Sequence, residues 1–358
     1  MRQLKTTAGL IDFCSNDYLG LARSEALRAL IHKAEAKYKQ LPMGATGSRL
    51  LSGNHTLFEE LENTIARYHH GEAALLYNSG YTANVGLLSA LPQRGDTVFY
   101  DEASHASMKD GLRLSFAKSY SFKHNDVSDL KRKLSHATGT VFVVVESVYS
   151  MDGDKAPLTE LAQLCQETGA ALIVDEAHAV GLYGPKGEGM TVALGLENQV
   201  FAQVITYGKA MGSHGAAVVG PKVLRDYLIN YSRAFIYTTG LPTHALITLQ
   251  CAYKLLPELD KERQHVKKLA QSLLEQLNKV KGIRCTPEES VILSVFLESG
   301  DVAKLKELAL YLQQNGFDVR PVLSPTVPQG QERLRVIVHA YNTEEEIEGL
   351  VQAIAKGK

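Results

Sequence analysis

Hydrophobic and polar positions follow two different patterns along the central part of the chain. Between about residues 55 and 220, short apolar or β-branched runs alternate with segments whose apolar residues recur every three or four positions. Near-continuous apolar strands separated by amphipathic helices predict a mostly parallel sheet with helices on both faces. The predicted strands are EAALLYN (72–78), DTVFYDE (96–102), TVFVVVE (140–146), ALIVDEA (171–177), QVITYG (203–208) and GAAVVG (215–220).

Two of the intervening segments have clear helix boundaries. Residues 55–71 place their apolar side chains on one helical face, with Asn54 as the predicted N-cap and Gly71 as the stop. Residues 157–169 begin with a proline and end with a glycine, which is typical of a helix that crosses between two parallel strands.

The pattern changes after Gly240, where a long helical stretch is followed by a second, smaller set of strands and helices. This change predicts a separate α+β domain at the C-terminus. Its predicted elements are a strand at 291–297, a helix at 302–316, strands at 317–322 and 333–338, and a last helix from Thr343. The predicted division is an N-terminal segment (1–40), a large cofactor domain (41–240), a helical connector (241–280) and a small domain (281–358).

Composition and charge exclude several classes of protein. The 358 residues include 38 Lys+Arg and 39 Asp+Glu, for a formal net charge of −1, so the basic surplus of a nucleic-acid enzyme is missing. No apolar run approaches the roughly 18–20 residues of a membrane helix, and the first residues lack the apolar core of a secretion signal. We therefore expect a cytoplasmic protein that binds neither nucleic acid nor membrane.

The cysteines and histidines do not form a metal-binding pattern. The four cysteines are scattered, and none of the 12 histidines belongs to an H-E-x-x-H motif or a Cys/His cluster. The sequence predicts free thiols and no metal site.

Reactive side chains follow two of the predicted strands. Asp175 and His178 end the ALIVDEAH run, and Thr206 and Lys209 end the VITYGKA run. In an open α/β sheet, ligands bind beyond the carboxyl ends of the strands, so these four side chains could surround one ligand. A carboxylate, an imidazole, a hydroxyl and a lysine suit pyridoxal 5'-phosphate (PLP), which enzymes hold through a lysine Schiff base and an acidic partner at the ring nitrogen.

The letters DEAH (175–178) also match a helicase motor box. A nucleotide motor needs a G-x-x-x-x-G-K-[ST] loop to bind phosphates, and this chain contains no such string. The Gly-Lys pair at 208–209 is followed by alanine and lies after DEAH in the chain. The motor interpretation is therefore rejected.

Ten ordered motifs resemble those of the α-oxoamine synthases, PLP enzymes of fold type I. The resemblance implies a large, mostly parallel sheet domain of the seven-stranded type and a small α+β domain. It covers nearly the whole chain. The motifs are SNDYLGL (15–21), GATGSRLLSGNH (44–55), NSGYTAN (78–84), DEASHAS (101–107), HNDV (124–127), ESVYSMDGDKAPL (146–158), VDEAHAVGLYGPKGEG (174–189), TYGKAMGSHGA (206–216), YTTGLPT (237–243) and SPTVPQGQERLRV (324–336).

The family joins an amino acid to an acyl thioester in a decarboxylative Claisen condensation. The spellings SNDYLGL and SRLLSGNH are most similar to the biotin-pathway branch, which uses L-alanine and a pimeloyl thioester of coenzyme A or acyl carrier protein. Two other branches, glycine C-acetyltransferase and 5-aminolevulinate synthase, remain alternatives. A different class is a regulatory subunit that keeps the fold and has lost the cofactor. Intact Lys209, Asp175 and His178 argue against that class.

The resemblance assigns roles around the cofactor. Lys209 is the Schiff-base lysine and the base for the substrate α-proton. Asp175 pairs with the ring nitrogen, His178 with the phenolic oxygen, and His105 stacks on the ring and donates to the acyl carbonyl or the carboxylate that is lost. Catalytic roles therefore fall to Lys209, His105, Asp175 and His178. The remaining predicted cofactor contacts are Ser79, Gly80, Tyr81, Ser147, Thr206 and Thr239.

The resemblance also implies a homodimer with shared active sites, because the family supplies the threonine at position 239 from the neighbouring subunit. Arg335 and Asn16 correspond to residues that hold the amino-acid carboxylate, a task suited to a guanidinium group, and Thr326 to a loop that lines the acyl site. Two features depart from the biotin-pathway pattern. Leu323 and Ser324 replace an arginine and a proline before PTVP, with Arg320 upstream. Arg2 is the one candidate for a further acyl-binding arginine.

Overall fold

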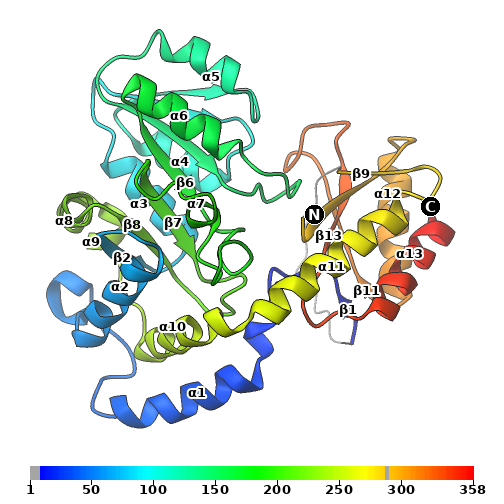
Figure 1. The fold of residues 1–358 in the computed structure, drawn as a ribbon, viewed down its shortest axis with the longest axis horizontal. Helices are drawn as coiled ribbons and strands as arrows, with labels where there is room; N and C mark the ends of the chain where they lie inside the picture. Colours follow the sequence, from blue (N-terminus) through cyan, green and yellow to red (C-terminus); the bar gives the residue numbers. More distant parts are fainter. Residues whose placement is uncertain (1–8, 287–289) are drawn as a thin grey trace. The chain divides into compact units, whose positions relative to one another are not determined.

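The computed structural model describes residues 9–286 and 290–358, and Arg2 lies outside them. Backbone contacts divide the chain into two compact units (Figure 1). The large unit comprises residues 21–149 and 155–259, and the small unit comprises residues 1–20, 150–154 and 260–358.

The large unit is built on a sheet of seven strands in the order β2-β8-β7-β6-β5-β3-β4. Its central strands are parallel, and β8 alone runs antiparallel to both of its neighbours. The strands are β2 (Ala73–Tyr77), β3 (Thr97–Asp101), β4 (Lys118–Phe122), β5 (Val141–Glu146), β6 (Ala171–Asp175), β7 (Val200–Thr206) and β8 (Ala216–Gly220). The expected mostly parallel sheet is confirmed.

Helices cover both faces of this sheet (Figure 1). Those of the large unit are α1 (Glu25–Glu35), α2 (Thr56–Tyr68), α3 (Gly80–Ala90), α4 (Ala106–Leu114), α5 (Val127–Leu134), α6 (Leu158–Thr168), α7 (Met190–Ala193), α8 (Lys222–Tyr231), α9 (Arg233–Ile236) and α10 (Thr243–Leu255). The large unit also contains the 3-10 turns η1 (Leu21–Arg23), η2 (Ala36–Tyr38) and η4 (Leu256–Glu258), and the π-helical turn η3 (Arg49–Gly53).

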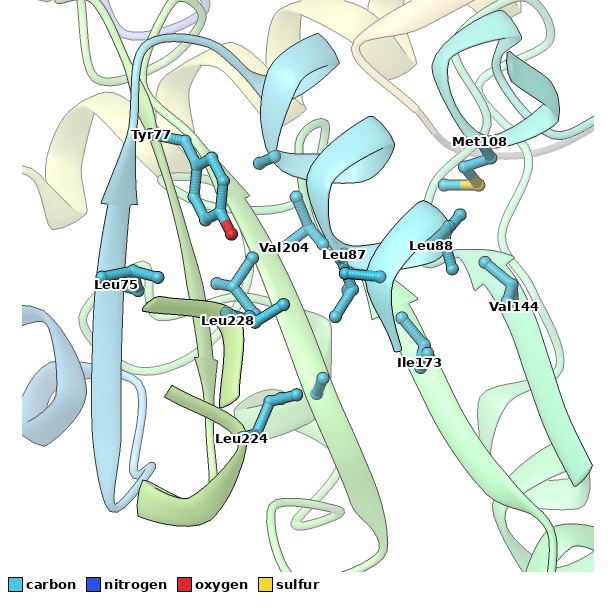
Figure 2. Close-up of a cluster of buried hydrophobic side chains, with 14 of the residues drawn as sticks. Leu75, Tyr77, Leu87, Leu88, Met108, Val144, Ile173, Val204, Leu224 and Leu228 are labelled. Carbon is cyan, nitrogen blue, oxygen red and sulfur yellow. The ribbon is translucent and has the colours of Figure 1, made fainter. Parts of the chain in front are cut away.

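The alternation of side chains along the strands separates two hydrophobic clusters. Val144 of β5 faces the cluster covered by α3, α4, α8 and α9, whereas its neighbour Val143 faces the cluster covered by α5 and α6. In Figure 2, Leu87 and Leu88 of α3 lie over Ile173 of β6 and its neighbouring strands. Helix α3 is thereby fixed on the sheet with its N-terminus directly after β2.

Two local predictions differ from the structure. The N-cap of α2 is His55 and not Asn54, so that boundary was wrong by one residue. The edge strand β4 was not predicted, because its sequence KSYSF is mostly polar and four of its five residues are exposed or half-buried. Helix α6 agrees with the prediction, since Pro157 is its N-cap and Gly169, at φ 70°, ends it in a left-handed conformation.

The small unit contains a four-stranded antiparallel sheet in the order β12-β13-β10-β9 and a parallel pair of β1 with β11. The predicted strand at 317–322 is divided between the two sheets. The strands are β1 (Ile11–Asp12), β9 (Ile283–Cys285), β10 (Ile292–Leu297), β11 (Phe317–Asp318), β12 (Arg320–Val322) and β13 (Arg333–Ile337), and the helices are α11 (Asp260–Leu277), α12 (Val302–Gln314) and α13 (Glu344–Gly357).

Three further findings concern thiols, metal ligands and membrane spans. All four cysteines are free, as expected. Among residues 9–286 and 290–358, no group of three or more His, Cys, Asp or Glu side chains could hold a metal ion. In the same residues, no helix is both long enough and apolar enough to cross a membrane.

Candidate active site

The end of strand β6 presents a buried carboxylate. Asp175 is the last residue of β6 and is only 5% exposed. Its Oδ2 accepts a hydrogen bond from Nδ2 of Asn84 at 2.7 Å, and its Oδ1 accepts from the backbone N–H of Ala177 at 2.9 Å. Two donors therefore fix the orientation of the carboxylate, as a partner for a cationic ring nitrogen requires.

Strand β7 brings a lysine to the same edge of the sheet. Lys209 follows β7 in a turn, and its Nζ donates to Nε2 of His178 at 2.7 Å. His178 is buried and follows β6. Because parallel neighbours β6 and β7 end at the same edge, the structure brings together Asp175, His178, Thr206 and Lys209, the group that the two sequence runs predict.

Helix α3 supplies a site for an anion. Ser79 is its N-cap, in a capping box with Thr82, and the first-turn amides of Gly80 and Tyr81 have no helical carbonyl to bond. Such a helix N-terminus favours a phosphate group. A Cβ at Gly80 would lie 2.3 Å from Oγ1 of Thr206, so only glycine lets the helix start this close to that hydroxyl.

His105 lies at the start of another helix. It is the N-cap of α4, and its Nδ1 accepts from the backbone N–H of Ser107 at 3.2 Å. Its own backbone N–H donates to Oε1 of Glu146 at 2.7 Å. Partial burial of the imidazole lowers the pKa of His105, which favours the neutral ring.

Two glutamates beside the site were not singled out from the sequence. Glu146 ends β5 next to Asp175, and burial beside that charge raises the pKa of Glu146. Burial also raises the pKa of Glu176, which accepts from Ser147 and from the backbone N–H groups of Met190 and Thr191. A signal was available in the sequence: acidic residues directly after apolar strands are unusual unless they have partners.

Ser147 and Thr239 are placed differently from the residues above. Ser147 is fully buried, with its hydroxyl 2.8 Å from the Glu176 carboxylate, and its predicted contact with the cofactor ring stays a prediction. Thr239 is exposed, and its carbonyl accepts from Nδ2 of Asn78 at 2.9 Å, which holds it beside the start of α3. Tyr81 is also exposed, with its hydroxyl bonded to Asp110.

The predicted carboxylate-binding pair lies in the small unit. On β13, Nη2 of Arg335 donates to Oδ1 of Asn16 at 3.1 Å, and its Nε donates to the carbonyl of Ser150 at 2.7 Å. Arg320 of β12 is directly opposite Arg335 in the register and is paired with Asp318 at 2.6 Å. Thr326 is exposed on the loop between these strands. The structure brings Arg335 and Asn16 together, and the role of each residue stays a prediction.

The side chains of the large unit match the functional groups of PLP. The buried Asp175 carboxylate suits the ring nitrogen, the His178 imidazole suits the phenolic oxygen, and the amine of Lys209 suits the aldehyde. The N-terminus of α3, which only glycine allows to start so close to Thr206, suits the phosphate.

Comparisons with known proteins agree with this site. A family model described as aminotransferase class I and II matches residues 8–354. The 8-amino-7-oxononanoate synthase of Emericella nidulans is 42% identical over 96% of this chain and 88% of its own length. That of Marinobacter nauticus is 39% identical over 98% and 87% of the two chains.

Solved structures of similar enzymes agree with these sequence matches. A serine palmitoyltransferase from Sphingomonas wittichii superposes with a TM-score of 0.91 at 30% identity, covering 97% of this chain and 87% of that chain. The crystal structure of 8-amino-7-oxononanoate synthase from Francisella tularensis superposes with a TM-score of 0.83 at 28% identity, covering 97% of both chains. The chain therefore belongs to the aminotransferase class I and II family and, within it, to the PLP-dependent α-oxoamine synthases.

Proposed function

We propose that this protein condenses L-alanine with a pimeloyl thioester to give 8-amino-7-oxononanoate, carbon dioxide and a free thiol, a step of biotin biosynthesis. The observation that carries the proposal is the contact of Lys209 with His178 beside the oriented Asp175 carboxylate. This arrangement suits an enzyme that removes and returns a proton at an amino-acid α-carbon. The curated relatives at 39–42% identity support the choice of substrates.

The bound PLP supplies an electron sink for the negative charge that develops at the α-carbon. Asp175 holds a negative charge against the ring nitrogen and so keeps that nitrogen protonated. The first-turn amides of α3 and the Thr206 hydroxyl bind the phosphate, and His178 donates to the phenolic oxygen. These residues fix the cofactor without taking part in proton transfer.

Lys209 is the residue that moves the proton. Its amine, on the turn after β7, takes the α-proton of alanine and later returns a proton to the product. Arg335 and Asn16 bind the alanine carboxylate, and His105 donates a hydrogen bond to the thioester carbonyl and then to the carboxylate that leaves as carbon dioxide. The ammonium form of Lys209 would be inactive, so the base must be neutral when substrate is bound.

We further propose that the protein acts as a homodimer. Met43 (88%), Leu51 (88%) and Tyr237 (72%) are among the apolar side chains that are strongly exposed on the large unit. Met43 lies just before η3, which contains Leu51, and Tyr237 lies in the loop after α9. Backbone hydrogen bonds from Gly240 to Gly47 and from Thr243 to Met43 join these two segments. An exposed apolar patch of this kind suits a subunit interface, and Thr239 belongs to the second of these segments. A cytoplasmic location stays a prediction from the sequence.

A substrate panel tests the reaction. Purified protein with PLP is assayed with alanine, glycine and serine against pimeloyl, succinyl, acetyl and palmitoyl thioesters, with the pimeloyl group carried by coenzyme A and by acyl carrier protein. The highest kcat/KM is expected for alanine with pimeloyl thioester. A higher value for glycine with acetyl or succinyl thioester would identify one of the other branches instead.

The cofactor lysine is tested separately from turnover. Borohydride reduction of the holoprotein should attach the pyridoxyl group to Lys209, which peptide mass spectrometry identifies. Lys209→Ala should take up no label and should lose at least about 10³-fold in turnover. A holoprotein that is labelled elsewhere, or not at all, would contradict the assignment.

A further inference from the structure

A buried chain of hydrogen bonds joins two of the predicted catalytic residues, Asp175 and His105. Nδ2 of Asn84 lies 2.7 Å from Oδ2 of Asp175 and 3.1 Å from Oγ of Ser107. Oγ of Ser107 in turn lies 2.8 Å from Nδ1 of His105. Asn84 and Ser107 are 3% and 0% exposed, so water does not compete for these bonds.

Close packing of two helices makes this chain possible. Asn84 lies on α3 and Ser107 on α4. A Cβ at Gly111 of α4 would lie 3.0 Å from the carbonyl oxygen of Asn84 and 3.0 Å from Cβ of Leu88. The absence of a side chain at Gly111 therefore allows the two helices to approach closely at the turn that carries Asn84.

Chemistry fixes the direction of donation along the chain. The Asp175 carboxylate only accepts, and the amide nitrogen of Asn84 only donates, so its two hydrogens go to Asp175 and to Ser107. The Ser107 hydroxyl has one proton and already accepts from Asn84. Nδ1 of His105 accepts the backbone N–H of Ser107 and so carries no proton of its own, which leaves the Ser107 hydroxyl as the donor in the 2.8 Å contact with Nδ1.

The N-terminus of helix α4 also favours an Nδ1 of His105 that carries no proton. Nδ1 of His105 also accepts the backbone N–H of Ser107 at 3.2 Å, and the positive end of the helix opposes a positive charge on the ring. Meanwhile Glu146 accepts the backbone N–H of His105 at 2.7 Å and holds the residue in place. With both donors directed at Nδ1, the single proton of the neutral imidazole lies on Nε2.

We propose that Asn84 and Ser107 are positioning residues that hold His105 as the neutral Nε2–H tautomer. In this form the ring offers one fixed hydrogen-bond donor for the carbonyl or carboxylate oxygen of the substrate and needs no added proton. This role in catalysis rests on the proposed function, whereas the tautomer itself does not. The same chain binds Asp175, so one pair of buried residues orients both the ring-nitrogen partner and the substrate donor.

The tautomer is measured on the cofactor-free protein by the 15N shifts of histidine ring nitrogens, with His105→Gln to assign the signals. Wild-type protein is expected to show the Nε2–H form. Asn84→Asp keeps the size of the side chain but presents an acceptor to Ser107, so the hydroxyl proton turns away from His105. Asn84→Asp and Ser107→Ala should each produce a mixture of the two tautomers.

Turnover gives an independent measurement. Asn84→Ala and Ser107→Ala should each lower kcat about tenfold, with a smaller change in KM for alanine. Because both residues act through the same chain of hydrogen bonds, the double variant should have a kcat no lower than that of the more impaired single variant. Thr97→Val is the matched control, since it removes a buried hydroxyl that donates to Thr138 at the opposite end of β3, and it should change neither tautomer nor kcat.

A wild-type ring protonated on Nδ1 would overturn the proposal. So would a tautomer that is unchanged in both Asn84→Asp and Ser107→Ala, or losses in kcat that add in the double variant. If the wild-type enzyme made no 8-amino-7-oxononanoate while the ring-nitrogen shifts followed expectation, the proposed function would fail and the positioning role would stand.

Discussion

At the scale of single residues, three buried carboxyl groups gather at the ends of β5 and β6. Glu146, Asp175 and Glu176 are all buried within a short distance along two neighbouring strands. Burial of several like charges destabilises a fold unless donors or protons compensate. Asp175 and Glu176 have donors on both oxygens. Burial raises the pKa of both glutamates, and Glu146 also lies beside the Asp175 charge, which further favours its protonated form.

This difference predicts a pH dependence of stability. Because the pKa of Glu146 is raised in the folded protein, its proton stabilises the fold below the ordinary glutamate pKa, and that stabilisation is lost as the pH rises toward the folded value. Glu146→Gln keeps an acceptor for the His105 N–H and removes the titration. The variant should therefore gain a few degrees in the thermal midpoint at about pH 8 and little at about pH 5.

The measurement is thermal unfolding of the cofactor-free protein at both pH values. Asp96→Asn is a control for the loss of one carboxylate at the opposite end of the sheet, where its side chain binds the backbone N–H groups of Gln93 and Thr140. If the difference in thermal midpoint between Glu146→Gln and wild type were the same at both pH values, Glu146 would not titrate in this range.

A second prediction concerns the contact of Gly80 with Thr206. Gly80→Ala places a methyl group 2.3 Å from the Thr206 hydroxyl and should displace that side chain, weakening PLP binding by roughly tenfold or more. Adding Thr206→Ala removes the clash, because the nearest remaining atom is Cβ at 3.4 Å. The double variant should regain the thermal midpoint of Thr206→Ala. Equal PLP affinity in Gly80→Ala and wild type, measured by fluorescence titration, would contradict this account.

Residues were predictable from the sequence where they end an apolar strand in a recognisable motif. Asp175, His178 and Lys209 were identified in this way, and the structure places them together. Asn84 and Ser107 lie inside quoted motifs, yet their pairing depends on the approach of α3 to α4, which no local pattern encodes. The burial of the Ser147 hydroxyl against Glu176 is likewise a product of tertiary packing.

At the scale of elements, the buried strands could be predicted from local sequence patterns, whereas the edge strand β4 could not. The strands β3, β5, β6 and β7 are nearly continuous apolar runs and were predicted from them. Strand β4 lies at the edge of the sheet and pairs only with β3, so its polar sequence resembles a loop. The antiparallel direction of β8 was not predicted either, because a buried strand has the same composition in both directions.

Glu176 connects two elements, since it links the end of β6 to the start of α7. Its Oε2 accepts from the Met190 N–H and the Ser147 hydroxyl, and its Oε1 accepts from Thr191. In Glu176→Gln, one carboxylate oxygen is replaced by an amide N–H₂ group, which cannot accept hydrogen bonds. The donors that bind that oxygen in the wild type would then be left unpaired. We expect a loss of about 1–3 kcal/mol in the free energy of unfolding, measured by urea denaturation.

The control for this variant is Glu167→Gln, an exposed position on α6, which should change the unfolding free energy by less than about 0.5 kcal/mol. An unchanged or higher stability for Glu176→Gln would mean that the buried charge costs more than its hydrogen bonds contribute.

At the scale of the whole molecule, oligomeric state and cofactor binding should be linked. The exposed residues Met43 and Tyr237 lie on two segments that backbone hydrogen bonds join, and the second segment carries Thr239, the residue that the proposed dimer offers to a neighbouring phosphate. A ligand that binds only the dimer stabilises it by mass action. No pattern in one chain reveals such sharing, so the family resemblance was its only source at the sequence level.

Leu51→Asp is the sharpest test of this link, because it places a charge in the apolar patch without touching the predicted cofactor contacts. Sedimentation should show a shift from dimer to monomer at micromolar protein, and PLP affinity should fall with it, since half of the shared phosphate site is lost. Added PLP should shift the variant back toward dimer. Leu310→Asp, an exposed leucine on α12 of the small unit, is the control and should sediment like wild type. A Leu51→Asp monomer that binds PLP with wild-type affinity would contradict the shared site while leaving the proposed reaction open to the substrate panel.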